Sequence, residues 1–220
     1  MAAIKTKDLF DLTHSRAGEK LAAYTYPWEA LAEIKQMVLQ IGAALDQEAY
    51  EHPQEDVWIA KSATVYPTAT IIGPCVIGER TEVRPGAFLR GSILVGDDAV
   101  VGNSSELKNC ILFDGVQVPH YNYVGDSILG YKAHMGAGAI TSNVKGDKKN
   151  VVVHGEQEYE TGRKKFGAML GDYAEIGCGS VLNPGTVIGR DSQVYPLSSV
   201  RGVVPERSVV KGERGIFPKK

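Results

Sequence analysis

An aliphatic residue recurs at every sixth position through the first half of the chain, and this spacing restricts the possible folds more than any other feature. The same spacing restarts at Leu170 and continues to Val200. A period of six fits neither the 3.6-residue period of a helix nor the turns every 8 to 12 residues of a hairpin array. The nine successive positions of the first run are Ile59, Val65, Ile71, Ile77, Val83, Leu89, Val95, Val101 and Leu107.

A mostly small residue follows four positions after each aliphatic residue, as at Ala63, Ala69 and Cys75. Both positions are expected to face inward. Each hexapeptide then forms one short strand and one corner, three hexapeptides form a triangular coil of about 18 residues, and coils stack about 4.8 Å apart. The alternative is a β-sandwich or barrel with evenly spaced strands, but that fold predicts alternating apolar and polar residues. The sequence therefore predicts a mostly β, hexapeptide-repeat solenoid, with many of its 25 Gly and 10 Pro residues at corners.

The segment before the repeats has helical character. Thr25 is a candidate cap and Pro27 a candidate first-turn residue. Trp28 is interpreted as a packing anchor. An apolar stripe then recurs at helical spacing, which predicts packing against the first coil, the outer surface or a neighbouring subunit. The residues of this stripe are Leu31, Ile34, Val38 and Ile41.

Three regions follow from these patterns. Residues 1–55 are expected to form a helical cap and linker, with the polar segment 47–56 as the linker. Residues 56–211 are expected to form the solenoid, and residues 212–220 a short basic tail.

Composition excludes several classes of protein. The formal net charge is −2 and the pI is about 6.2, so no general basic surface for nucleic acid is expected. No apolar run approaches the length of a bilayer span, and the N-terminus lacks the apolar core of a signal peptide, so we expect a cytoplasmic protein without a membrane partner. The cysteines Cys75, Cys110 and Cys178 lack a CxxC pair, which disfavours disulfides and zinc.

The six-residue register breaks between Leu107 and Leu170, and residues 118–150 of this stretch are rich in His, Tyr, Asn, Lys and Gly. Because a solenoid requires only its period, we expect functional residues at this interruption. Gly136 and Gly138 permit close approach of the backbone to a ligand. A solvated bulge is the alternative interpretation.

Three basic residues, Arg84, Arg90 and Lys108, directly follow an aliphatic position and are expected to face outward. Lys108 should lie one strand spacing from Arg90, because 18 residues separate them, whereas Arg84 should lie one hexapeptide earlier, across a corner. Stacked cations repel unless an anion lies between them, so they predict a phosphate site. Alternatively, both long side chains extend into water.

Four ordered motifs carry a resemblance to a known family: RPGAFL at 84–89, VGNSSELKN at 101–109, PHYNYVGD at 119–126 and GAGAITSN at 136–143. They resemble the acetyltransferase domain of bacterial bifunctional N-acetylglucosamine-1-phosphate uridyltransferase/glucosamine-1-phosphate N-acetyltransferase. Segment 161–172 looks more like the archaeal-type sugar-1-phosphate nucleotidylyltransferase/amino-sugar acetyltransferases. The resemblance implies a left-handed parallel β-helix. A nucleotidyltransferase domain is not expected.

The resemblance also implies roles for single residues. His120 is the implied general base. Where the family usually has Asn, Asn-Tyr and Ser, this chain has His134, Asn143-Val144 and Cys178. The implied substrate contacts are Arg84, Lys108, Tyr123, His134 and Lys149, and the implied coenzyme contacts are Ala137, Asn143 and Cys178.

The implied activity is acetyl transfer from acetyl-CoA to the amine of glucosamine-1-phosphate or galactosamine-1-phosphate, in nucleotide-sugar precursor biosynthesis by a homotrimer without a metal. The acceptor amine arrives as ammonium and must lose a proton, and His120 provides a suitable base. Backbone N–H groups around Gly136 to Gly138 are expected to stabilise the oxyanion.

Two other functions stay open from the sequence. The first is a non-catalytic or regulatory solenoid, which the departures at His134, Val144 and Cys178 favour. The second is a metal-dependent enzyme resembling the γ-class carbonic anhydrases. Its ligands would be His120, His134 and His154, although their spacings do not match the HxxxxH pair of that family.

Overall fold

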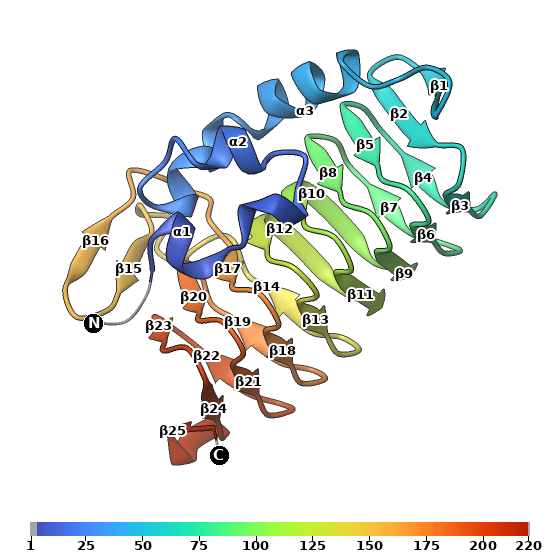
Figure 1. Ribbon diagram of the computed structural model, residues 1–220. Coiled ribbons are helices and arrows are strands. Elements are labelled where there is room, and N and C mark those ends of the chain that lie inside the picture. The colour runs from blue at the N-terminus through green and yellow to red at the C-terminus, as the bar shows by residue number, and fades with distance from the viewer. Residues whose placement is uncertain (1–3, 220) are drawn as a thin grey trace.

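The computed structural model describes residues 4–219, and its main body is a parallel β-helix with three faces (Figure 1). Each face is a column of short strands, hydrogen-bonded to the coils before and after. The predicted hexapeptide solenoid is therefore confirmed. We name the faces A, B and C in the order in which the chain visits them.

Face A contains β2 (Val57–Ala60), β5 (Cys75–Ile77), β8 (Ile93–Val95), the second halves of β10 (Glu106–Leu112) and β12 (Tyr123–Leu129), β17 (Ala168–Leu170), β20 (Thr186–Ile188) and β23 (Val203–Val204). Face B contains β3 (Thr64–Val65), β6 (Glu82–Val83), β9 (Val100–Asn103), β11 (Gln117–His120), β13 (His134–Met135), β18 (Glu175–Ile176), β21 (Gln193–Val194) and β24 (Ser208–Val210). Face C contains β4 (Thr70–Ile71), β7 (Phe88–Leu89), the first halves of β10 and β12, β14 (Ile140–Thr141), β19 (Val181–Leu182) and β22 (Ser199–Val200).

The strand register shows where the repeat is interrupted. Cys75 pairs with Ile93, an offset of 18 residues, but Ile93 pairs with Cys110 at an offset of 17. Farther along, Ile128 pairs with Met169, because an insertion follows β14. The predicted slips are thus shortened coils and one inserted segment.

Aliphatic positions of the repeat line the interior. Ile77, Leu89, Val101 and Leu107 are completely buried. Burying a side chain of this size contributes about 1.5–3 kcal/mol. Most of the coils therefore have a continuous apolar core, which explains why the period of six is so regular.

The N-terminal segment lies along face A and does not cover an end coil (Figure 1). The predicted helix is confirmed, although it starts with a 3-10 turn and its first-turn hydrogen bond runs from Tyr26 N to Glu29 Oε2 (3.0 Å), so Thr25 is not the cap. The apolar stripe faces β5, β8 and β10. The elements are α1 (Thr6–Leu9), η1 (Leu12–His14), α2 (Gly18–Leu21), η2 (Pro27–Ala32) and α3 (Ile34–Ala43).

Trp28 is a packing residue, as predicted. Its ring stacks on those of Tyr26 and Phe166, with centroids 4.7 and 5.9 Å apart, and meets the edge of Tyr159. Tyr159 belongs to the inserted hairpin of β15 (Val152–His154) and β16 (Glu158–Glu160). The insertion is therefore anchored on the N-terminal segment.

Antiparallel strands lie at both ends of the solenoid, where the sequence predicted a linker and a tail. The predicted linker contains β1 (Tyr50–Gln54), which pairs with β2. The predicted tail contains η3 (Gly212–Arg214) and β25 (Ile216–Pro218), which pairs with β24. Both strands cover edges that would otherwise be open to pairing with another chain. No helix within residues 4–219 is both long and apolar enough to cross a membrane.

Candidate functional site

The corner between faces B and C brings together three of the residues singled out from the sequence: His120, Ala137 and Cys178. Each lies two positions after the inward aliphatic residue of its coil, as does Asn103 on the coil before. Backbone hydrogen bonds join these coils, from Gly138 N to His120 O (3.0 Å) and from Gly179 N to Ala137 O (2.8 Å). Successive coils therefore place one functional candidate each at this B–C corner.

His120 has an exposed side chain that makes no hydrogen bond or ion pair with any other described residue. Its backbone is held by Asn122, whose Oδ1 accepts a hydrogen bond from His120 N (3.0 Å). Asn122 is 2% exposed, and its Nδ2 donates to the carbonyls of Gly136 and Ala139. The imidazole is thus available to a ligand on a rigid backbone. The sequence analysis missed Asn122, whose only signal was a polar residue next to the break in register.

Gly136 and Gly138 do not serve the role expected of them. The N–H of Gly136 donates to Ile176 O (2.7 Å) and that of Gly138 to His120 O, so neither is available to an oxyanion. A Cβ on Gly136 would lie 2.7 Å from Cys178 N, and Gly138 has a φ of +70°. The glycines therefore permit coil stacking and a turn. Within residues 4–219, the Ala137 N–H donates no hydrogen bond.

The three predicted phosphate ligands do not form one cluster. Arg90 and Lys108 are stacked on face C, because Leu89 pairs with Leu107, whereas Arg84 follows β6 on face B. Each arginine has a carboxylate partner. Arg84 bonds Glu82 at 3.0 Å, and Arg90 bonds Glu106 at 2.5 Å. Lys108 forms no ion pair with a described residue, so it is the cation best placed to accept an anion.

Tyr123 and Asn143 lie side by side on face C. Asn143 Nδ2 donates to Tyr123 Oη (3.2 Å) and to Asp126 Oδ2 (2.6 Å). Burial, with a smaller contribution from Asp126, raises the pKa of Tyr123 above its usual value. Asn143, implied to contact the coenzyme, is thus bonded to the residue implied to contact the substrate.

His134 lies on face B, where its Nδ1 is 2.8 Å from Glu175 Oε2. Both residues line an open cavity of about 390 Å³, together with Gln117 and Lys132. Lys149 is exposed in the insertion and bonds none of the other candidate side chains among the described residues. The structure therefore does not bring Lys149 into the B–C corner by any direct contact.

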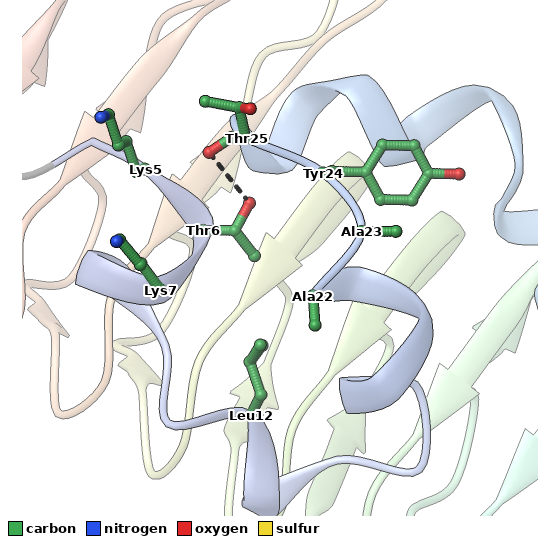
Figure 2. A pocket seen from close by; sticks show the side chains of 8 residues that line it. All are labelled: Lys5, Thr6, Lys7, Leu12, Ala22, Ala23, Tyr24 and Thr25. Atoms are coloured by element: carbon green, nitrogen blue, oxygen red, sulfur yellow. Dashed lines mark hydrogen bonds between the residues drawn. The ribbon is translucent and has the colours of Figure 1, made fainter.

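A second cavity, of about 470 Å³, lies among the N-terminal helices (Figure 2). Thr6 Oγ1 donates to Thr25 O (3.3 Å) across it, and Lys5 and Lys7 lie at its rim. Its described lining contains no carboxylate or imidazole that could act as a base. The B–C corner is therefore the better candidate site. No group of three or more His, Cys, Asp or Glu side chains within residues 4–219 is arranged to hold a metal ion.

The coils place the chain in the class of hexapeptide-repeat parallel β-helices. Residues 71–158 match the family model described as the GMPPB C-terminal domain. Within this class the chain is related to the bifunctional protein GlmU. It is 36% identical to GlmU from Methanococcus aeolicus over 167 residues, which cover 68% of this chain and 41% of that protein.

A second relative is the bifunctional sugar-1-phosphate nucleotidylyltransferase/acetyltransferase of Sulfurisphaera tokodaii, 32% identical over 59% of this chain and 31% of the relative. The chain thus spans well under half the length of these relatives. Among solved structures, perosamine N-acetyltransferase from Caulobacter crescentus, in complex with CoA and GDP-perosamine, matches with a TM-score of 0.36 and 20% identity, over 73% of this chain and 56% of that one. WeeI from Acinetobacter baumannii matches with a TM-score of 0.41 and 18% identity, over 70% and 57%.

Proposed function

We propose that this chain is an acetyl-CoA-dependent acetyltransferase that acts on the amine of an amino-sugar 1-phosphate. The observation that supports the proposal most is the stacking of His120, Ala137 and Cys178 at the B–C corner, with Tyr123 and Lys108 on the adjoining face C. The relatives support it, because one is named as a sugar-1-phosphate nucleotidylyltransferase/acetyltransferase.

The exposed imidazole of His120 takes a proton from the acceptor ammonium, so that the amine carries a free electron pair. The amine attacks the thioester carbonyl carbon, a C–N bond forms, and the C–S bond to coenzyme A breaks as the tetrahedral intermediate collapses. The attacking nitrogen, which is cationic in the intermediate, loses its second proton to water, and the proton held by His120 passes to the departing thiolate. No covalent intermediate with the protein is needed, so Cys178 is a neighbour of the coenzyme in this scheme.

The Ala137 N–H is the donor for the oxyanion of the intermediate. Within residues 4–219 this N–H has no hydrogen-bond acceptor, whereas the N–H groups of Gly136 and Gly138 on either side of it are both hydrogen-bonded. A donor that is fixed before the reaction stabilises developing charge without reorganisation. Ala137 also lies one coil from His120, which places base and oxyanion donor on neighbouring coils.

The sugar phosphate binds at Lys108, whose ammonium has no carboxylate partner within residues 4–219. Arg90 is stacked next to Lys108 and can provide a second cation. Its exposed ion pair with Glu106 can be given up for the phosphate, because exposed pairs of this kind contribute about 1 kcal/mol or less to stability. Binding through the phosphate orients the amine toward His120 and so lowers the entropic cost of the reaction.

The corner is open on one side, with His120, Ala137 and Cys178 all exposed. A neighbouring subunit that packs against this corner would exclude water from it. The proposal therefore includes a homotrimer with sites between subunits.

A thiol-release assay tests the function. The purified chain is incubated with acetyl-CoA and glucosamine-1-phosphate, galactosamine-1-phosphate or their nucleotide-linked forms, and free coenzyme A is measured. We expect release with at least one amino-sugar 1-phosphate. Release that is equal with and without an acceptor, or that requires a nucleotide-linked sugar, would contradict the proposal.

A further inference from the structure

We propose that Asp126 is a positioning residue of the acceptor site, because its buried carboxylate fixes the amide of Asn143 and thereby presents Asn143 Oδ1 and the hydroxyl proton of Tyr123 to the ligand. This inference rests on the proposed function for the identity of the ligand. It concerns a residue that makes no contact with the ligand itself.

The carboxylate of Asp126 is enclosed by amides. Asp126 is 4% exposed, Oδ1 accepts from Asn109 Nδ2 (2.9 Å), and Oδ2 accepts from Asn143 Nδ2 (2.6 Å). Asn109 Nδ2 also donates to Leu31 O (3.2 Å), which links the site to the N-terminal segment. A buried carboxylate with hydrogen bonds from both sides is expensive to leave unsatisfied. The contact with Asn143 is therefore held firmly.

This contact determines which way the amide of Asn143 points. An ionised carboxylate only accepts hydrogen bonds, so the atom of Asn143 that faces Asp126 must be the NH₂ group. Its second hydrogen is directed to Tyr123 Oη at 3.2 Å. Both hydrogens are then used, and Asn143 Oδ1 is left as an acceptor with no partner among the described residues.

The same geometry sets the role of Tyr123. Its oxygen already accepts from Asn143, so its own proton is the group it can offer to a ligand. Burial is the largest cause that raises the pKa of Tyr123, and the charges of Asp126 and Glu106 raise it further. The hydrogen bond from Asn143 and the charge of Arg90 lower this pKa by smaller amounts. The hydroxyl therefore stays protonated and acts as a donor.

Gly125 makes room for this arrangement next to the cation. A Cβ at this position would lie 2.5 Å from Tyr123 Oη and 2.9 Å from Asn143 Nδ2. Gly125 pairs directly with Lys108 across the two coils. One acceptor, one donor and one free ammonium are thus gathered on face C, which suits a hydroxylated ring that carries a phosphate.

The test is Asp126→Asn, with Asp98→Asn as the matched control on an exposed aspartate of the turn between β8 and β9. The first readout needs no substrate. Tyrosine ring signals are followed by ¹³C NMR against pH, and Tyr123 is assigned with Tyr123→Phe. We expect the pKa of Tyr123 to fall in Asp126→Asn and to stay unchanged in Asp98→Asn. An unchanged Tyr123 titration in Asp126→Asn would overturn the inference.

The second readout is kinetic. We expect the KM for the acceptor to rise about 10- to 100-fold in Asp126→Asn, and to rise more than the KM for acetyl-CoA, because misplacing one polar group costs roughly this much. A merely structural role would instead lower the amount of active protein and leave both KM values alone, which would overturn the inference. If the wild-type chain transfers no acetyl group, the proposed function fails, and the Tyr123 titration still decides the role of Asp126.

Should Asp126→Asn not fold, Asn143→Ala provides the same test from the other side. Asn143→Ala removes the hydrogen bond from Asn143 that lowers the pKa of Tyr123, so we expect the pKa of Tyr123 to rise. No change in the Tyr123 titration would then overturn the inference.

Discussion

At the scale of single residues, the B–C corner contains side chains that hold the coils together and side chains that are left for a ligand. Asn122 is buried and bonds three backbone groups, whereas the ring of His120, two residues earlier, bonds no side chain or backbone group of the described residues. The cysteines differ in exposure in the same way: Cys178 is exposed, whereas Cys75 and Cys110 are completely buried. Exposure at a rigid corner is what marks His120 and Cys178 as candidates.

Cys178 alone should react with iodoacetamide in the native protein at pH 8. Burial raises the pKa of Cys75 to about 12 and that of Cys110 well above its usual value, so both stay protonated and shielded. Mass spectrometry of peptides should find one modified cysteine, and acetyl-CoA should slow the reaction if Cys178 adjoins the coenzyme. Modification of all three cysteines at similar rates would contradict the buried core.

Gly136→Ala should destabilise the chain by about 1–3 kcal/mol, because the new methyl group would lie 2.7 Å from Cys178 N. Gly146→Ala is the matched control, since nothing lies within 4 Å of its Cβ position and its φ is not in the left-handed region. Urea unfolding measures both. Equal stability of the two variants would show that close coil stacking does not require Gly136.

The sequence predicted single residues best where the period dictated them. Most aliphatic positions of the repeat are buried, although Ile59, Val65 and Ile71 are only partly buried. The roles of His120, Ala137 and Cys178 came from the family resemblance, and the spacing did not predict their shared corner. The spacing also placed Arg84 across a corner from Arg90 and Lys108, as the structure has it. Side-chain pairs such as Arg90 with Glu106 are not encoded in the spacing. Local periodicity cannot reveal which carboxylate neutralises which cation.

At the scale of elements, the N-terminal segment is fixed to face A by buried polar contacts as well as by its apolar stripe. Asp172 is completely buried, bonds Arg190, and accepts from Asp11 N (2.7 Å) and Tyr131 N (2.9 Å). Arg16 forms a two-pronged pair with Asp97 (2.6 and 3.2 Å). These contacts join the segment to several coils at once.

Asp172→Ala should cost about 3 kcal/mol, because it leaves Arg190 and two backbone N–H groups without their partner. We expect faster hydrogen exchange around residues 6–21 than in the wild type. Asp98→Asn, which removes the charge of an exposed pair with Arg80 and tolerates the left-handed backbone of this residue (φ +53°), should change stability by less than about 1 kcal/mol. Unchanged exchange of the segment in Asp172→Ala would show that the apolar stripe alone holds it.

Elements with their own periodicity were predictable, and those defined by pairing were not. Helix α3 was visible as a stripe of apolar residues at helical spacing. Strands β1 and β25 have no hexapeptide register, and each forms because an open edge of the solenoid is available to it. The N-terminal helices α1 and α2 are only four residues each, too short to show a period.

At the scale of the whole molecule, the B–C corner runs along successive coils of the solenoid and exposes His120, Ala137 and Cys178. If a neighbouring copy closes this corner, the chain should sediment and scatter light as a trimer at micromolar concentration. Multi-angle light scattering of the purified chain measures this. A monomer at all concentrations would contradict the proposed sites between subunits, without affecting the fold.

In the proposed reaction, His120 at the B–C corner deprotonates an amino-sugar 1-phosphate for acetyl transfer. The direct measurement is the rate of N-acetyl product formation, by mass spectrometry, with acetyl-CoA and glucosamine-1-phosphate or galactosamine-1-phosphate. Glucose-1-phosphate, which lacks the amine, is the substrate control, and His154→Ala, an exposed histidine of the inserted hairpin, is the protein control. We predict product only with an amine, and a loss of about 100-fold or more in His120→Ala but not in His154→Ala. Product formation at the wild-type rate by folded His120→Ala would contradict the account.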